Sequence, residues 1–224
     1  SDPLYFTGCL LAMGYMDVGL AGSVSTTGDV LRAAIHTIGL RSGSTTISSS
    51  FIMELPTGEV VSFGDCAVIP MPNAEQLATI AHDSAMVYHS LTGVEPKIAL
   101  LSFSTNGSAD HERVQVPRDA LQVYKEQGGG FEMDGELQFD AAWDTSVARR
   151  KAPDSKVAGQ ANVFVFPSLE AGNIGYKMVE RLAGARATGP IIQGLNKPML
   201  DLSRGCDAND IVNTACVGVL MTKN

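Results

Sequence analysis

The sequence predicts an α/β fold, in which helices pack on the faces of a largely parallel sheet. Strand-like runs alternate with helix-like runs along all 224 residues, a pattern typical of layered α/β proteins. Two strand-like runs, residues 97–103 and 162–166, are almost wholly apolar, as expected for strands buried on both faces. A polar, glycine-containing stretch at residues 104–110 follows the first run. Ligands often bind at such strand-to-helix loops.

The expected helices are recognised by their caps and by apolar periodicity. Pro3 suits the first position of one helix, and Thr26 or Thr27 suits the cap of another. Asn73 is expected to cap a long amphipathic helix that ends at Gly93. Together these signals predict helices at residues 2–16, 27–39, 74–92, 112–127, 172–182 and 208–221.

The expected strands are short apolar segments bounded by turn residues. They cover residues 17–24, 45–55, 59–63, 97–103, 131–137, 162–166 and 191–193. The dipeptide Thr57-Gly58 is predicted to form the turn of a hairpin between the second and third of these. The sequence contains no internal repeat or low-complexity tract.

Composition excludes several classes of partner. The chain has 16 basic and 24 acidic residues, a net charge of −8, so neither nucleic acid nor an acidic membrane is an expected partner. No apolar run approaches the roughly 20 residues that span a bilayer. The four cysteines lack CxxC or metal-ligand spacing, so we expect reduced, buried thiols in a cytoplasmic protein, and no metal site. A polyanionic small ligand would need only a few converging arginines.

Ser203 and Arg204 are the first candidates for such a site. They lie in the segment Leu202-Ser203-Arg204-Gly205, just before the last expected helix. A hydroxyl, a guanidinium and backbone N–H groups at a helix amino terminus form a good receptor for a phosphate or an oxyanion. Serine is also common in ordinary loops that precede helices, so the motif alone leaves both interpretations open.

Four stretches of the chain are too specific to reflect packing alone: residues 63–78 (FGDCAVIPMPNAEQLA), 97–109 (KIALLSFSTNGSA), 134–142 (DGELQFDAA) and 157–205. Together they closely resemble the phosphate acetyltransferase family, in register from about residue 2 to residue 222. The block GPIIQGLNKP, followed by DLSRG and DIVNTA, is specific to this family and its acyl-phosphate relatives.

The resemblance implies two three-layer α/β/α domains of the isocitrate/isopropylmalate dehydrogenase-like fold, with the substrate cleft between them. By this analogy, residues 1–43 and 190–224 form one domain and residues 44–189 form the other. Family members carry a further amino-terminal segment, which supplies another active-site arginine. The first domain is therefore expected to be incomplete at its amino-terminal end, with an open sheet edge and uncovered apolar surface. The resemblance also implies a homodimer.

The resemblance assigns catalytic roles to three residues. Ser203 and Arg204 match the pair that binds the phosphate and the acyl carbonyl, and Asp210 matches the aspartate thought to take the thiol proton of coenzyme A. The spacing of Asp207 and Asp210 is also that of a capping box, which would explain an acid at this position without catalysis.

Further residues are expected to bind substrate. The family places an important arginine at the position of Arg32, although pairing with Asp29 is an alternative. Arg181 is a candidate for the phosphates of coenzyme A. The loop that contains Ser102, Ser104 and Thr105 offers hydroxyl and backbone donors for phosphate oxygens, or is a simple polar connection.

The function implied is reversible transfer of an acetyl group between coenzyme A and inorganic phosphate, by direct attack in a ternary complex. Acetyl phosphate is the phosphorylated partner, and this chemistry requires no metal or redox cofactor. One alternative is a phosphate butyryl- or other acyltransferase, because a methylene or two changes affinity by only about 1–3 kcal/mol. Another is a non-catalytic domain that senses acetyl-CoA, like that of some malic enzymes.

Overall fold

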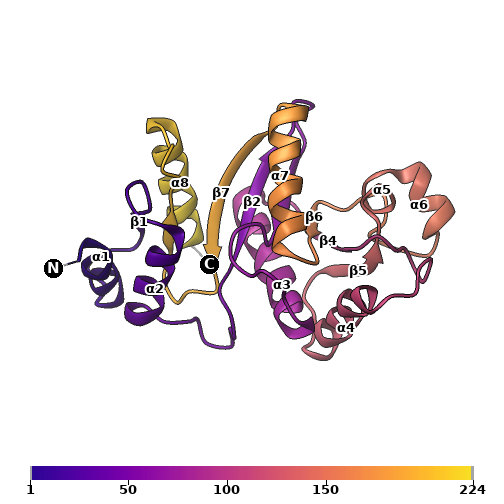
Figure 1. Cartoon of the computed structure of the whole chain (residues 1–224), viewed down its shortest axis with the longest axis horizontal. Coiled ribbons are helices and arrows are strands. Elements are labelled where there is room, and N and C mark those ends of the chain that lie inside the picture. The colour runs from indigo at the N-terminus through magenta and orange to yellow at the C-terminus, as the bar shows by residue number, and fades with distance from the viewer. Residues whose placement is uncertain (1, 223–224) are drawn as a thin grey trace.

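The computed structural model describes residues 2–222, which form two sheets flanked by helices (Figure 1). A six-stranded sheet with helices on both faces makes up one part of the molecule. A two-stranded sheet with three helices makes up the other. This arrangement confirms the predicted α/β fold class.

The larger sheet combines a parallel part with an antiparallel edge. Its strands, in order, are β5 (Glu132–Leu137), β4 (Lys97–Leu101), β6 (Val163–Val165), β3 (Val60–Gly64), β2 (Ser48–Glu54) and β7 (Arg186–Gln193). The first four run parallel to one another. Strand β2 is antiparallel to both of its neighbours, so the predicted hairpin between β2 and β3 is confirmed.

Alternate side chains of the central strands divide the core into two layers. Ile98 and Leu100 pack with α3 (Ala74–Thr92) and α4 (Glu112–Glu126) on one face. Ala99 and Leu101 pack on the other face with α5 (Phe139–Trp143), α6 (Thr145–Lys151) and α7 (Leu169–Ala183). Both faces of these strands are therefore buried, which explains their continuous apolar sequence.

The smaller sheet pairs strands that are far apart in the sequence. Strand β1 (Gly19–Ala21) runs parallel to β8 (Met199–Asp201). Helices α1 (Pro3–Ala12), α2 (Thr27–Thr37) and α8 (Ala208–Met221) surround it. This part thus combines the two ends of the described chain. Helix α8, which follows β8, packs against β1 (Figure 1).

Several predicted helix boundaries are confirmed. Asn73 caps α3 with a complete capping box, and Gly93 ends that helix in the left-handed conformation. Pro3 lies at the start of α1, and Thr26 caps α2. These boundaries depend on local hydrogen bonds, which sequence signals report directly.

Other boundaries differ from the predictions. The expected strand at residues 17–24 contains only β1, and the expected helix at residues 2–16 ends at Ala12. Strand β7 begins at Arg186, ahead of the expected residue 191, although it contains Pro190. This is possible because β7 is an edge strand and its pairing with β2 is irregular at that point. Strand β8 and the short helices α5 and α6 were not predicted.

Two segments of the chain connect the part that contains the larger sheet to the part that contains the smaller sheet. The segment after α2 and the segment after β7 lie side by side, because Leu40 bridges to Leu195 and the Arg41 N–H donates to the Gly194 carbonyl at 2.9 Å. The division into residues 1–43 with 190–224 and residues 44–189 stays a prediction. Residue 190 itself lies inside β7.

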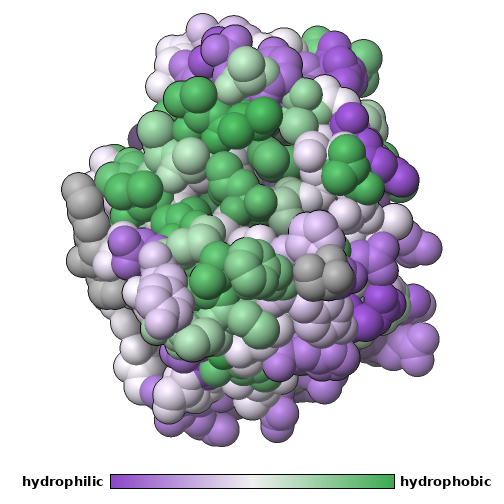
Figure 2. Space-filling view, turned by 90° about the vertical axis from the view of Figure 1, so that its left-hand side faces the viewer, coloured by the Kyte–Doolittle hydropathy of each residue, from purple (hydrophilic) through white to green (hydrophobic). Residues whose placement is uncertain are grey.

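The end of the molecule formed by α1, α2 and α8 exposes apolar side chains. Figure 2 faces this end and shows a broad hydrophobic area. Exposed members on these elements include Phe6, Ile35, Val212 and Val219. An apolar face of this kind agrees with the expectation that the smaller part is incompletely covered.

The cysteine prediction is only partly correct. The four cysteines are unpaired, as expected, but only Cys66 is buried, whereas Cys9 and Cys216 are exposed. No helix within residues 2–222 has the length and apolar character needed to cross a membrane. Within the same residues, no group of three or more His, Cys, Asp or Glu side chains is arranged to hold a metal ion.

Candidate active site

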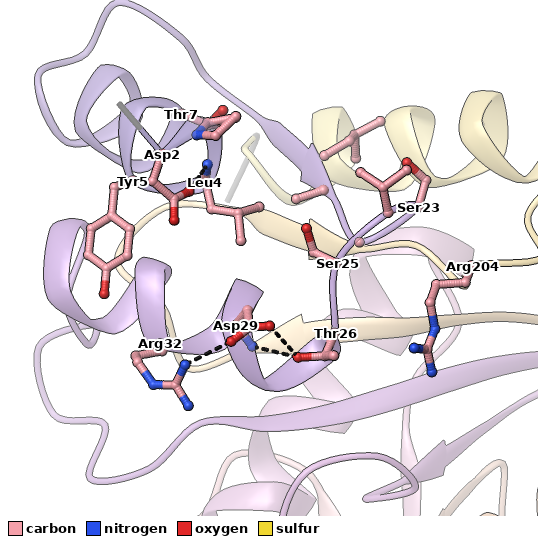
Figure 3. A pocket seen from close by; sticks show the side chains of 15 residues that line it. Asp2, Leu4, Tyr5, Thr7, Ser23, Ser25, Thr26, Asp29, Arg32 and Arg204 are labelled. Atoms are coloured by element: carbon pink, nitrogen blue, oxygen red, sulfur yellow. Dashed lines mark hydrogen bonds and ion pairs between the residues drawn. The ribbon is translucent and has the colours of Figure 1, made fainter.

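The loop between β8 and α8 contributes residues to the walls of two cavities. The first, which we call the α1–α2 cavity, has a volume of about 750 Å³ and lies between α1, the segment after β1, and α2. Its lining includes Arg32 and Arg204 (Figure 3). In this view Thr26 and Asp29 lie between the two arginines.

The second cavity, the α7–α8 cavity, has a volume of about 540 Å³. It lies between β2, α7, β7, the β8–α8 loop and the start of α8. Ser203, Asp210 and Arg181 are among its lining residues. The adjacent residues Ser203 and Arg204 therefore contribute to different cavities, which makes this loop the link between them.

The β8–α8 loop presents its polar groups to solvent. Ser203 and Arg204 are exposed, and the Gly205 N–H donates to Ser203 Oγ at 3.2 Å. The Arg204 guanidinium makes no hydrogen bond or ion pair with any described residue. An exposed guanidinium without an internal partner is available to bind an anion.

Asp210 serves as a helix-capping residue and also faces a cavity. The Asp207 N–H donates to Asp210 Oδ2 at 3.0 Å, and the Asp210 N–H donates to Asp207 Oδ1 at 2.9 Å. The capping-box interpretation is therefore confirmed. It does not remove Asp210 from the α7–α8 cavity, because the carboxylate is exposed and its Oδ1 has no hydrogen bond with the described residues.

Arg32 has an internal partner. Its Nη1 lies 2.8 Å from Asp29 Oδ1, and both side chains are exposed. Asp29 also accepts a hydrogen bond from Thr26 Oγ1 at 2.7 Å. Hydrogen bonds from Thr26 and Arg32 lower the pKa of Asp29. The alternative pairing is thus present, and it directs Arg32 along the wall of the α1–α2 cavity (Figure 3).

Arg181 lies at the rim of the α7–α8 cavity. Its side chain is 81% exposed, and its Nε is 3.4 Å from Glu180 Oε2. An exposed pair at this distance contributes little to stability. The guanidinium can therefore exchange Glu180 for a ligand phosphate at small cost.

The structure does not place the loop after β4 in either cavity. Ser104 and Thr105 are buried, and the Ser104 hydroxyl donates to Glu136 Oε1 at 2.7 Å. The Gln138 N–H donates to Thr105 Oγ1 at 2.9 Å, and Ser102 Oγ accepts from the Ser104 N–H at 3.2 Å. The Ser104 hydroxyl therefore binds an internal carboxylate, that of Glu136.

Glu136 is held by an unusually complete set of donors. Arg118 forms a bidentate pair with it through Nε at 2.7 Å and Nη2 at 2.9 Å, and the Gly107 N–H donates at 2.9 Å. Burial raises the pKa of Glu136, but the hydrogen bonds from Arg118, Gly107 and Ser104 outweigh this effect and lower it to about 2. The loop is thus fixed by an ion pair whose carboxylate is buried.

Sequence reasoning missed the apolar wall of the α7–α8 cavity. Phe51 and Tyr176 stack with their ring centroids 4.2 Å apart. Gly189 permits this arrangement, because a Cβ atom there would lie 2.7 Å from Phe51 Cδ1. The glycine was visible in the GPIIQG motif, but its partner across the sheet could not be read from the sequence.

Comparison with known proteins places this geometry in a family. Residues 1–219 match the family described as phosphate acetyl/butaryl transferase. A phosphate acetyltransferase of Clostridium acetobutylicum is 48% identical over 99% of this chain and 68% of its own length. A crystal structure of a phosphotransacetylase from Streptococcus pyogenes matches with a TM-score of 0.95 and 44% identity, over 98% of this chain and 67% of that one.

More distant structures share only the fold. A 4-hydroxythreonine-4-phosphate dehydrogenase from Klebsiella pneumoniae matches with a TM-score of 0.55 and 13% identity, over 98% of this chain and 69% of that one. This agrees with the dehydrogenase-like fold predicted from the sequence. The chain spans about two-thirds of the length of the phosphate acetyltransferase relatives described above.

The fold and these relatives define the chain as a member of the acyltransferases. It belongs to the phosphate acetyl/butaryl transferase family.

Proposed function

We propose that the chain transfers an acetyl group between coenzyme A and inorganic phosphate, and that the β8–α8 loop is the centre of this chemistry. The observation that carries the proposal is Arg204, which has no partner within residues 2–222 and lies beside Ser203 on the loop that lines both the α1–α2 and the α7–α8 cavity. Two substrates that react directly need binding spaces close to one another, and these two cavities are lined by consecutive residues, Ser203 and Arg204.

In the proposed reaction, the phosphoryl group of acetyl phosphate binds to Arg204 and Ser203, with help from Arg32. Coenzyme A enters through the α7–α8 cavity, where Arg181 contacts its phosphates. Asp210 accepts the thiol proton, and the thiolate attacks the acetyl carbonyl carbon. The C–S bond forms, the bond from carbonyl carbon to phosphate oxygen breaks, and inorganic phosphate leaves. Donors near Ser203 stabilise the tetrahedral oxyanion.

The two candidate catalytic groups should differ in importance. A free thiol has a pKa of about 8.5, so about a tenth of it is already ionised at pH 7.5. Loss of the base in Asp210→Asn should therefore lower kcat by about tenfold. Loss of the anion-binding group in Arg204→Ala should lower it by about 10²- to 10³-fold.

These variants are tested by phosphate-dependent release of the thiol from acetyl-CoA. Arg149→Ala is the matched control, because Arg149 is exposed on α6, at the other end of the molecule (Figure 1). Turnover of Arg204→Ala within threefold of Arg149→Ala would contradict the assignment.

Acyl-chain preference and the sensor alternative are tested with the same assay. We propose that acetyl-CoA is turned over faster than propionyl-CoA and butyryl-CoA. A preference for butyryl-CoA would identify a butyryltransferase, and binding of acetyl-CoA without turnover would identify a sensor domain.

A cytoplasmic location, a homodimer and reaction without a metal or redox cofactor complete the proposal. Light scattering of the purified protein tests the oligomeric state, and assays after dialysis against a chelator test the metal requirement.

A further inference from the structure

Asp201 is a buried acid that the proposed mechanism does not use. It is the last residue of β8 and only 3% exposed. It has no cationic partner within residues 2–222, and its Oδ1 has no hydrogen-bond partner there. Burial raises the pKa of Asp201, and hydrogen bonds from the Thr27 hydroxyl and the Leu202 backbone oppose that effect. A buried carboxylate with so few partners is costly for stability, which indicates a role other than stabilisation.

The carboxylate joins two segments that are remote in sequence. Asp201 Oδ2 accepts a hydrogen bond from the hydroxyl of Thr27, the first residue of α2. The amino terminus of a helix favours a negative charge. Arg32 follows Thr27 by five residues on the same helix, and Arg204 follows Asp201 by three. One contact thus connects the segments that carry both arginines of the α1–α2 cavity.

The chain around Asp201 leaves little room for adjustment. A Cβ atom at Gly22 would lie 2.0 Å from Asp201 Oδ1 and 2.5 Å from the Leu202 carbonyl oxygen. Gly22 has a φ of +104°, and the Leu202 N–H donates to the Ala21 carbonyl at 2.7 Å. The turn at Gly22 therefore lies close to Oδ1, the carboxylate oxygen to which Thr27 does not donate.

We propose that Asp201 is a positioning residue, which fastens the start of α2 to the β8–α8 loop so that Arg32 and Arg204 hold one phosphoryl group between them. The inference rests on the proposed function, because it concerns the anion that this function requires. Misplacing a binding group by about 1 Å costs about 100-fold in rate, so one hydrogen bond at this junction has a large effect on ligand binding.

The test removes the contact from either side. Thr27→Val deletes the donor without changing side-chain shape, and Asp201→Ala deletes the acceptor. Asp201→Asn keeps an acceptor oxygen for Thr27. Thr37→Val is the matched control, because Thr37 lies on the same helix and its hydroxyl bonds only to the Ala33 carbonyl within the described residues.

For acetyl transfer, Thr27→Val and Asp201→Ala are each expected to raise the KM for phosphate at least tenfold. The KM for acetyl-CoA should stay within twofold, because Arg181 lies on α7. The double variant should be no worse than the more impaired single variant, and Asp201→Asn should recover to within threefold of wild type. A purely structural defect would instead lower the active fraction, and thus kcat, with unchanged KM.

Binding of inorganic phosphate, measured by isothermal titration calorimetry, provides a readout that does not depend on turnover. Affinity should fall at least tenfold in Thr27→Val and remain unchanged in Thr37→Val. Wild-type affinity in folded Thr27→Val would overturn the positioning role while leaving the proposed function intact. Failure of the wild-type protein to bind phosphate would overturn the positioning role, and failure to release thiol from acetyl-CoA would overturn the proposed function.

Discussion

The two sheets of this protein differ in how completely they are covered, and this difference corresponds to a division between stability and chemistry. The central strands of the six-stranded sheet are buried on both faces. In the two-stranded sheet, Leu20 and Ala21 of β1 are only partly buried. The adjoining helices α1 and α8 expose Phe6 and Val212, at the end of the molecule shown in Figure 2.

Charged groups follow the same division. Around the larger sheet, Glu136 is bound by Arg118 and by the loop after β4. Around the smaller sheet, Arg204 has no partner within residues 2–222, and Arg32 has only an exposed one. Groups that are fully bound inside the protein stabilise the fold, whereas groups left unbound at the surface are available to a ligand. The arginines with the strongest case for binding substrate therefore lie in the less covered part.

The strongest test of the comparison uses one phenylalanine from each part. Phe164 is fully buried in β6 and packs edge-on against Phe63, so Phe164→Ala should lower the free energy of unfolding by about 3–5 kcal/mol. Phe6, on α1, is 60% exposed, and Phe6→Ala should cost less than about 1 kcal/mol. Urea denaturation measures both. Equal costs would show that the exposed end is covered in solution.

The buried ion pair gives a second, somewhat smaller effect. Glu136→Gln should cost about 3 kcal/mol at pH 7, because the pKa of this carboxyl is about 2 in the folded chain against 4.5 in an exposed glutamate. The pKa of Glu136 is therefore lower in the folded chain than in the unfolded chain. The stabilisation is therefore fully present above pH 4.5 and is lost as the pH falls from 4.5 towards 2.

Glu132→Gln is the control for this prediction. Glu132 lies on the same strand and forms only an exposed pair with Lys156 at 3.6 Å, so its replacement should change stability by less than about 0.5 kcal/mol. The two variants are compared by urea denaturation between pH 3 and pH 7. If the difference between them stays constant over this range, the Glu136 account fails.

The smallest expected effect compares two valines on one helix. Val217 on α8 is 9% exposed and Val212 is 60% exposed. Val217→Thr buries a hydroxyl in an apolar layer and should cost about 1–2 kcal/mol. Val212→Thr makes the same substitution at an exposed position and should change the free energy of unfolding by no more than about 0.5 kcal/mol. A larger loss for Val212→Thr would mean that a partner covers this side of α8.

The sequence was most informative where structure depends on neighbouring residues. The helix cap at Asn73, the glycine stop at Gly93 and the hairpin turn at Thr57-Gly58 are local signals, and the structure confirms all three. Strand β8 has only three residues and pairs with β1, about 180 positions earlier. No local signal specifies such a pairing. Helix α6 had one usable signal, the cap at Asp144.

The site was predictable in composition but not in arrangement. The sequence indicated Ser203, Arg204 and Arg32 as anion-binding groups, and the two arginines line one cavity. It could not indicate that Glu136, 32 residues beyond Ser104, accepts hydrogen bonds from the Ser104 hydroxyl and the Gly107 N–H in the loop after β4. The role of Asp201 was equally hidden, because its partner Thr27 lies on an element that meets β8 only in the folded chain.

The location of a bound acyl phosphate tests the central claim most directly. A crystal of the protein soaked with acetyl phosphate should show the phosphoryl oxygens within about 2.7–3.2 Å of the Arg204 guanidinium, at the junction of the two cavities. Phosphate bound instead to the loop after β4, or an Arg204 side chain directed away from a ligand that is clearly present, would contradict the account.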